Sequence, residues 1–562
     1  MGAGRNAFEF RGLEFHSSRM WQWAQVDRAL ALMRELGLNA LIFHQNDLTD
    51  QLVLPGKWFP EELMWKINPV RMHTIGNNRH YVNRVVAAAK ELGIDFYVEV
   101  KELWFPDALP DVVPGLRNSD GSLCPHNPFF REFLHEKYRE LVDAVPGLAG
   151  VIVSAGTRES KVSISANRCG CERCRTNTPL DWYTGLLQSI YDPLSERGKL
   201  LAVRDFAYTA EVQSTMITAA DRVSQEIVVT LKNAPHDYYP NFPDNPKIGS
   251  CGAHRQWVEF DGWGQFYGLG FFPVSVVEDM QKRMRRCRDL HVDGVWVRTD
   301  WEVITDGGAF NSFNLVNVFG AALFSADPET DADEVYRRWL SYGLLSPLKP
   351  ASALEAASPP LPAAFQQIVS MMKTSWTVME KATYVRGHVF NEDDQFPNSV
   401  ERAFDMMVRI HGRDEWEPGA SSRLEPTPEN LDAIFAEKRE AVILVRKIAA
   451  SFDSAALGVN PGLASEIDTV LDLYTWYVRG FEVCARLCFL AKRAESTAAG
   501  SDAAELERAA AELRDFRDGM MARMANTHYP HYVYWLLDEK RLWELAADGE
   551  RRLANMRGGA RS

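Results

Sequence analysis

The sequence predicts an α/β protein in which a (β/α)8 barrel spans residues 1–325 and an all-helical domain spans residues 326–562. Four observations predict it. Eight short apolar runs alternate with amphipathic stretches before residue 325, and the pattern is helical after Pro362. No glycine-rich phosphate loop follows any run, which favours a closed barrel over a doubly wound open sheet, and the length also suits a barrel.

The eight runs are rich in β-branched and aromatic residues and predict the barrel strands. They are FEFRGLEF (8–15), ALIFH (40–44), DFYVEV (95–100), GVIVSA (150–155), LLAVRDF (200–206), IVVTLKN (227–233), RQWVEF (255–260) and GVWVRTD (294–300). Helical patterns follow most of them, but a proline-rich loop connects the sixth run to the seventh.

The second half of the chain shows helical periodicity in four long segments, within residues 365–385, 430–452, 465–494 and 503–524. The preceding segment, residues 327–362, changes composition, and its proline-rich end predicts a linker or crossing loop.

Composition and charge exclude several classes of function. The net charge of -14 does not favour binding to nucleic acid or to an anionic membrane. No apolar run reaches the roughly 18 residues of a membrane span, and the N-terminus lacks an apolar signal core, so we expect a cytoplasmic protein. The sequence permits a homodimer but does not determine the number of subunits.

The cysteines are unevenly placed. Cys169, Cys171 and Cys174 form a C-x-C-x-x-C pattern, and Cys124 precedes them in SLCPHNP. In a reducing compartment such a cluster indicates a metal site more than a disulfide, and Cys124 would complete a tetrahedral structural zinc site. The alternative is a group of free thiols in a long loop.

Polar and aromatic side chains follow every predicted strand, where a barrel of this kind binds its substrate. The candidate substrate-binding residues are His44, Lys101, Trp104, Arg204, Lys232, His236, Asp300 and Trp301. Carboxylates at the same ends include Glu159, Asp237 and Glu259. Aromatic rings stack on sugars and charges bind hydroxyls, while paired carboxylates provide the acid and base of glycoside hydrolysis. The pattern predicts a carbohydrate substrate.

The order of several segments resembles the catalytic barrel of glycoside hydrolase family 67, the α-glucuronidases. The segments that carry the resemblance are LGLNALIFHQND, NPFFREFLHEKYRELVDAVPGLAGVIV, LLAVRDFAY, TLKNAPHDYYPNFPDNPKIG, QWVEFDGWGQFYGLG and FNLVNVFGAALFSADPETDADEVYRRWL. The resemblance implies an inverting enzyme that removes glucuronic acid or its 4-O-methyl ether from xylan fragments. The family's N-terminal β-sandwich has no counterpart in these residues.

The resemblance also implies roles for two basic residues. In the family, an arginine on the fifth strand and a lysine on the sixth hold the uronic acid carboxylate, and Arg204 and Lys232 match them. The lysine at the end of a buried strand would then meet its partner when substrate binds. The alternative is an internal salt bridge of Lys232 with Asp205 or Asp237.

For the chemistry, the resemblance implies Glu159 as general acid, offset by one residue, and Asp237 as general base. The family's second base is a glutamate where this chain has Gln265, which can orient a water molecule but cannot accept its proton. Either Asp237 acts alone, or Glu259 or Asp261 takes the second role, or the chemistry differs. The family's additional lysine near the acid is also missing.

The leading hypothesis is an inverting glycosidase that acts from the chain end on a uronic-acid-bearing glycoside or oligosaccharide and needs no catalytic cofactor. A hexosaminidase-like enzyme is an alternative, but such enzymes show Asp-Glu after the fourth strand, where this chain has Arg158-Glu159. A catalytically silent carbohydrate-binding barrel is the third hypothesis.

Overall fold

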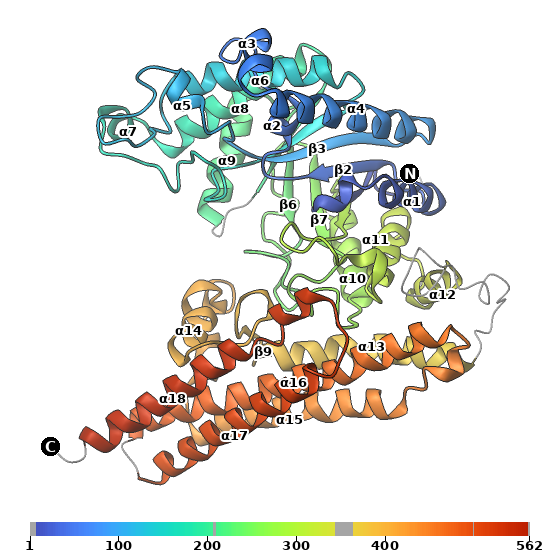
Figure 1. Cartoon of the computed structure of the whole chain (residues 1–562), viewed down its shortest axis with the longest axis vertical. Helices are drawn as coiled ribbons and strands as arrows, with labels where there is room; N and C mark the ends of the chain where they lie inside the picture. Colours follow the sequence, from blue (N-terminus) through green and yellow to red (C-terminus); the bar gives the residue numbers. More distant parts are fainter. Residues whose placement is uncertain (1–6, 206–209, 343–362, 498–499, 560–562) are drawn as a thin grey trace.

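The structure, a computed structural model, describes residues 7–205, 210–342, 363–497 and 500–559. Eight parallel strands form a closed barrel in which each strand pairs with the next and β8 returns to β1 (Figure 1). The strands are β1 Phe10–Phe15, β2 Ala40–His44, β3 Asp95–Glu102, β4 Gly150–Ala155, β5 Leu200–Arg204, β6 Val228–Lys232, β7 Gln256–Asp261 and β8 Gly294–Arg298. The predicted barrel and its eight strands are confirmed.

Helices surround the barrel as crossover connections between the strands. The long ones are α1 Trp23–Leu36, α4 Pro69–Glu91, α6 Phe129–Ala144, α8 Pro179–Ser195, α9 Ala210–Val223, α10 Val277–Asp289 and α11 Leu315–Ala326. Shorter helices lie in the loops: α2 Leu48–Leu52, α3 Glu61–Ile67, α5 Leu109–Val112 and α7 Glu172–Thr176. Residues 233–255, all of which are described, contain no helix, as the proline-rich sequence predicts.

The interior of the barrel has an apolar lower layer and a charged upper layer. The rings of Phe10, Tyr97, Trp257 and Trp296 fill the lower layer, and Phe10 stacks on Trp257 with ring centroids 3.7 Å apart. Gly12 makes room for them, because a Cβ there would lie 2.6 Å from the Cβ of Trp296. Side chains of a strand alternate between its two faces, so the inward positions that follow along the strands form the next layer.

In that upper layer the inward positions are polar or charged. They are Glu14, His44, Glu99, Lys101, Ser154, Arg204, Lys232, Glu259 and Arg298, all buried. Barrel interiors are usually packed with branched apolar side chains, so a charged layer beneath the carboxyl ends of the strands indicates a functional site.

The C-terminal half is helical, apart from the short hairpin of β9 Tyr384–Val385 and β10 His388–Val389. Its helices are α13 Ala363–Thr383, α14 Val400–Phe404, α15 Pro428–Ser451, α16 Pro461–Thr497, α17 Gly500–Met524 and α18 Glu539–Gly559. The preceding helix α12 Ala332–Tyr342 packs against α10 and α11 on the barrel side. The proline-rich linker predicted before Pro362 lies outside the described residues. Among the described helices, none is long and apolar enough to cross a bilayer.

The helical domain packs on loops that follow β6 and β7. Tyr239 and Phe266 of these loops join an apolar cluster with Tyr384 and Met406 of the helical domain. In the loop after β7, the ring of Phe272 stacks on that of Tyr477 in α16, with centroids 4.6 Å apart. The helical domain therefore sits beside the carboxyl ends of two barrel strands.

Candidate functional site

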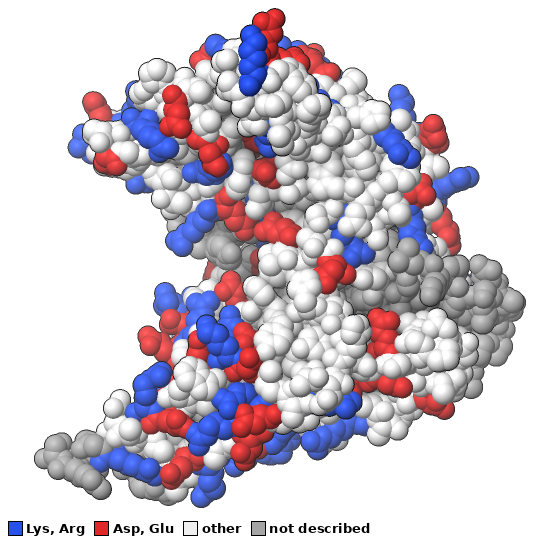
Figure 2. Space-filling model, viewed as in Figure 1, with Lys and Arg blue, Asp and Glu red and all other residues white. Residues whose placement is uncertain are grey.

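A cavity of about 180 Å³ lies where the strand ends meet the helical domain. Figure 2 shows the surface hollowed between the same two parts of the chain, with acidic and basic side chains inside the hollow. The residues that line the cavity are His16, Lys101, Glu159, Arg204, Lys232, Asp237, Tyr239, Gln265, Phe266, Arg298, Trp301, Glu302, Glu392, Asp393 and His411. Glu392, Asp393 and His411 come from the helical domain, so both parts of the chain form the site.

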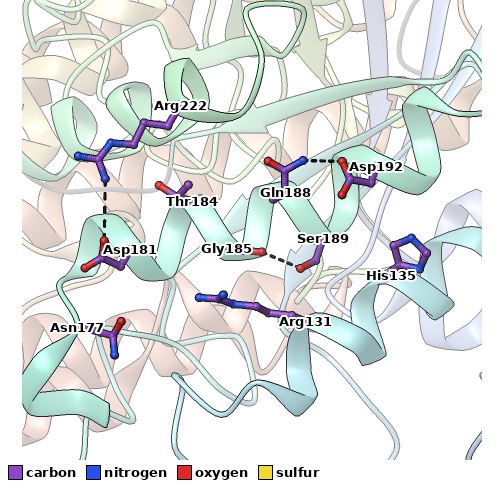
Figure 3. Close-up of a pocket in the computed structure, with 10 residues that line it drawn as sticks. All are labelled: Arg131, His135, Asn177, Asp181, Thr184, Gly185, Gln188, Ser189, Asp192 and Arg222. Atoms are coloured by element: carbon purple, nitrogen blue, oxygen red, sulfur yellow. Dashed lines mark hydrogen bonds and ion pairs between the residues drawn. The ribbon is translucent and has the colours of Figure 1, made fainter. Parts of the chain in front are cut away.

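A larger hollow of about 490 Å³ lies on the outside of the barrel, along α6 and α8 (Figure 3). Its wall is polar surface: Gln188 donates to Asp192 at 2.5 Å, and Arg222 lies 3.9 Å from Asp181. It is remote from the strand ends at which barrel enzymes carry their chemistry, so the smaller cavity is the candidate site.

Arg204, predicted as a carboxylate ligand, is anchored within the protein at the floor of the cavity. Its Nε and one terminal nitrogen bind the two oxygens of Glu259 at 2.7 and 2.9 Å. The terminal nitrogens also donate to Ser154 Oγ at 3.1 Å and to Tyr238 OH at 2.7 Å. Glu259 itself does not line the cavity. This bidentate pair is therefore structural in the conformation observed.

The glutamates around Arg204 differ in their acidity. Burial alone would raise the pKa of Glu259, but the charge and hydrogen bonds of Arg204 lower it to about 2. For Glu99, burial outweighs the opposing charge of Arg204, which lies 3.0 Å away, and raises the pKa to about 7. Burial also raises the pKa of Glu14, whose Oε1 lies at hydrogen-bond distance from His44 Nδ1, 2.8 Å away. The predicted ligand His44 thus lies beneath the cavity and not on its wall.

Lys232 has a partner inside the protein. Its Nζ lies 2.6 Å from Asp237 Oδ1, and the same oxygen accepts the backbone N–H of Tyr238 at 3.0 Å. Burial lowers the pKa of Lys232, and the charge of Asp237 opposes this effect. Of the two sequence interpretations, the structure shows the internal salt bridge, so the expectation that the lysine's partner arrives only with substrate was wrong.

Glu159 stands at the opening of the cavity. Its carboxylate lies 3.2 Å from Lys101 Nζ, which is buried at the end of β3, whereas the glutamate side chain is 37% exposed. The following residues tie this loop to β3, because Ser160 Oγ donates to the Glu102 carbonyl at 2.6 Å and Lys161 N–H to the Leu103 carbonyl at 3.0 Å. A lysine is therefore present beside Glu159, although it comes from β3 and not from β4.

Gln265 holds a carboxyl group from the helical domain. Its Nε2 donates to Asp393 Oδ1 at 3.1 Å, and its backbone N–H donates to Asp261 at 2.8 Å. Asp394 next in the chain accepts the backbone N–H of Gly268 at 2.6 Å, which fixes this loop on the barrel. Burial raises the pKa of Asp393 to about 7, with contributions from Glu392 and Asp237. Asp393 also has a φ of 49°, a left-handed conformation that aspartate adopts more readily than most residues.

Arg298, at the end of β8, is a second functional candidate that the sequence interpretation missed. It is 2% exposed, and its Nε and one terminal nitrogen have no hydrogen-bond partner among the described residues. The same terminal nitrogen lies 3.3 Å from an oxygen of Asp261 and forms an ion pair with it, and the guanidinium lies 4.3 Å from the ring centroid of Tyr238. The inward position of Arg298 on a strand that ends at the site could have identified it, whereas Asp393 carries no such signal.

Of the other predicted residues, one lines the cavity and three lie outside its lining. Trp301 lines the cavity. Asp300 instead accepts the backbone N–H of His16 at 2.6 Å and is buried. Trp104 stacks beneath Lys161, 5.4 Å from its Nζ, and His236 binds Glu415 of the helical domain at 3.0 Å. These three residues are outside the cavity lining.

The four cysteines of the predicted metal site form a separate group between the loop after β3 and the loop after β4. Their sulfur atoms all lie within 4.8 Å of one another. Cys124 therefore lies beside the C-x-C-x-x-C segment, as predicted.

Comparison with known proteins identifies the fold but no family. No protein-family model matches the chain, and no curated protein matches it in sequence. Among solved structures, a "GH138 enzyme targeting pectin rhamnogalacturonan II" is similar over 99% of this chain and 84% of that one, with a TM-score of 0.64 and 12% identity. An O-GlcNAc hydrolase mutant of Thermobaculum terrenum is similar over 98% and 94% of the two chains, with a TM-score of 0.42 and 13% identity.

The first likeness shows an architecture, a (β/α)8 barrel with a helical region, that a glycoside hydrolase also has. At 12% identity it shows the fold alone. Membership of family 67 is not shown and remains a prediction.

Proposed function

We propose that this protein is an inverting glycoside hydrolase that removes a terminal uronic acid residue from a carbohydrate. The observation that carries the proposal is the composition of the cavity wall, which combines four lysine and arginine side chains with two groups of carboxylates. One group follows the carboxyl ends of barrel strands and the other comes from the helical domain. The small size of the cavity favours one sugar ring, and therefore action at a chain end.

The basic side chains provide the selectivity for an acidic sugar. Arg298 is the proposed main ligand of the sugar carboxylate, because its buried Nε has no hydrogen-bond partner within the described chain and its planar group can bind a carboxylate through two hydrogen bonds. The terminal nitrogen that would form the second bond lies 3.3 Å from Asp261 in an ion pair. Lys101 and Lys232 line the same cavity and contribute charge. Arg204 supports them from the floor, where Glu259 holds its guanidinium in place.

Glu159 is the proposed general acid. A general acid must carry a proton when the leaving group departs, whereas the carboxylate of Glu159 now faces the ammonium of Lys101 at 3.2 Å. A uronic acid carboxylate that binds Lys101 would replace Glu159 as its partner and place a second negative charge nearby, which favours the protonated acid. The negative charge of the substrate would thus favour the protonated, active form of Glu159, and neutral sugars would be poor substrates.

Asp237 is the proposed general base, and Asp393 is the proposed second carboxylate of a catalytic base pair. In this mechanism a water molecule attacks the anomeric carbon while the base accepts its proton, and Glu159 protonates the departing glycosidic oxygen. Gln265 is then a positioning residue that holds Asp393 through its amide N–H. The carboxylate that the family 67 resemblance places at position 265 would come instead from the helical domain.

The similar solved structure adds one reason to consider an acidic substrate. That enzyme targets pectin rhamnogalacturonan II, and a galacturonan is a polymer that contains galacturonic acid. We therefore include galacturonides with glucuronides as candidate substrates, in both anomeric forms.

The test is hydrolysis of aryl glucuronides and galacturonides, with the matching neutral glycosides as controls and the first-formed anomer followed by NMR. We expect turnover of an acidic glycoside with inversion. Glu159→Gln should slow substrates with poor leaving groups more than activated aryl glycosides, because only the former need a proton donor. Asp237→Asn should slow both.

Three results would contradict the proposal. Binding without turnover of any glycoside would indicate a silent carbohydrate-binding barrel. Turnover of N-acetylhexosaminides alone would indicate the hexosaminidase-like alternative. Full activity of Asp237→Asn would exclude Asp237 as the base.

A further inference from the structure

Four cysteine thiols outside the catalytic cavity converge on one point. The sulfur of Cys124 lies 3.5 Å from that of Cys171 and 3.6 Å from that of Cys174, and Cys169 lies 3.6 Å from Cys174. A tetrahedron of sulfurs bonded at about 2.3 Å to a zinc ion has edges of about 3.8 Å. These three separations agree with that edge within about 0.3 Å, and the other sulfur–sulfur distances are at most 4.8 Å, which suits a mononuclear tetrathiolate site.

We propose that Cys124, Cys169, Cys171 and Cys174 bind one structural zinc ion. Four thiolates complete the tetrahedral coordination of zinc and leave no position for a water molecule, which is the arrangement of a structural site. Cys124 and Cys174 are each 1% exposed, so the ion would be shielded from solvent on one side. A cluster of several irons would hold its cysteine sulfurs farther apart than these four.

The surroundings of the thiols are those of a metal site. The side-chain amide of Asn118 donates to Cys169 at 3.6 Å. Such N–H donors stabilise thiolates and orient them, and outer partners of this kind support metal ligands.

The charge of the adjacent chain also fits the proposed ion. A zinc ion with four thiolates has a net charge of −2. The segment around the site carries Arg168, Arg173 and Arg175 against the single acid Glu172. The excess positive charge of this segment offsets the negative charge of the zinc–thiolate site.

The zinc ion would join two loops that are far apart in sequence. Cys124 belongs to the loop between β3 and α6. The other three lie in the connection between β4 and α8, Cys174 within its short helix α7, and the candidate acid Glu159 is near the start of the same connection. A bridge across these loops would fix the distal end of the loop that carries the acid. This role applies to whatever reaction the cavity performs, so the site can be tested without a substrate.

The experiment measures metal in the protein purified under reducing conditions. We expect about one zinc per chain by mass spectrometry, released when a mercurial reagent modifies the thiols. Cobalt(II) exchanged into the same protein should show the intense visible absorption of tetrahedral thiolate coordination. The double variant Cys171→Ser/Cys174→Ser should lose the metal, whereas the matched control Cys287→Ala, a buried cysteine of α10, should retain it.

The wild-type measurements do not depend on the folding of any variant. Protein that stays free of zinc after reconstitution would overturn the proposal, as would disulfides among the four cysteines under reducing conditions. One iron per chain would overturn the assignment of zinc. Metal loss on chelation with no change in melting temperature would overturn the structural role.

Discussion

The substitution Asp393→Asn tests whether the helical domain contributes to catalysis. Asparagine has nearly the shape of aspartate, and its side-chain oxygen can still accept the hydrogen bond that Gln265 donates at 3.1 Å. The change therefore removes the ability to accept a proton and leaves the loop in place. If Asp393 is part of the base, kcat/KM should fall by about 10²–10⁴-fold.

The pH dependence provides a second, independent measure. The pKa of Asp393 is raised, mainly by burial, to about 7, so the wild-type kcat/KM should rise with pH up to about 7 and this limb should disappear in Asp393→Asn. For stability, the raised pKa means that the native state binds this proton more tightly than the unfolded state. Its stabilising contribution is complete below about pH 4 and is lost as the pH rises through about 7.

The magnitude of that stability change follows from the pKa. Displacement from an ordinary value of 3.8 to about 7 corresponds to at most about 4 kcal/mol, and residual solvent contact reduces this to about 1–3 kcal/mol. Urea denaturation at pH 4 and pH 8 should show wild type losing this much relative to Asp393→Asn. Asp405→Asn, a partly exposed aspartate of the same domain paired with Arg409, is the matched control and should change neither activity nor pH dependence.

Two results would refute this reasoning. Unchanged kcat/KM and an unchanged pH profile in Asp393→Asn would show that the residue only joins the two domains. A stability difference that is the same at pH 4 and pH 8 would show that the carboxyl group does not titrate in this range.

Three further predictions concern the charges of the cavity. Arg298→Met should weaken the binding of a uronic acid by about 2–5 kcal/mol more than that of the matching neutral sugar, measured by calorimetry; equal losses would mean that the arginine is structural. Arg204→Met should lower the free energy of unfolding by about 3–5 kcal/mol in urea, because Glu259 remains buried without its partner. Adding Glu259→Gln to Arg204→Met should restore part of the loss, and full stability of the single variant would contradict the structural role. Gln265→Glu places a second carboxylate beside Asp393, and its negative charge should raise the pKa of Asp393 and shift the pH–activity profile to higher pH. An unshifted profile would contradict the contact between residues 265 and 393.

The sequence by itself determined the barrel and the position of its charges. Eight apolar runs with helical connections predict a closed parallel sheet, and this is the fold observed. Because side chains alternate along a strand, the same pattern that fills the lower barrel with aromatic rings directs Lys101, Arg204 and Lys232 inward at the strand ends. Periodicity and burial are local properties of the chain, so they can be read without its coordinates.

Which charged side chains pair with one another depends on the tertiary structure. The sequence places Arg204, Lys232 and Asp237 at one end of the barrel, but their partners depend on separations of a few ångströms, and in a poorly hydrated interior such differences determine the pairing. Asp393 lies in a different domain, 128 residues after Gln265 in the chain, and reaches the cavity only because the two domains pack together. No local pattern records that packing, because it is produced by contacts between residues distant in sequence.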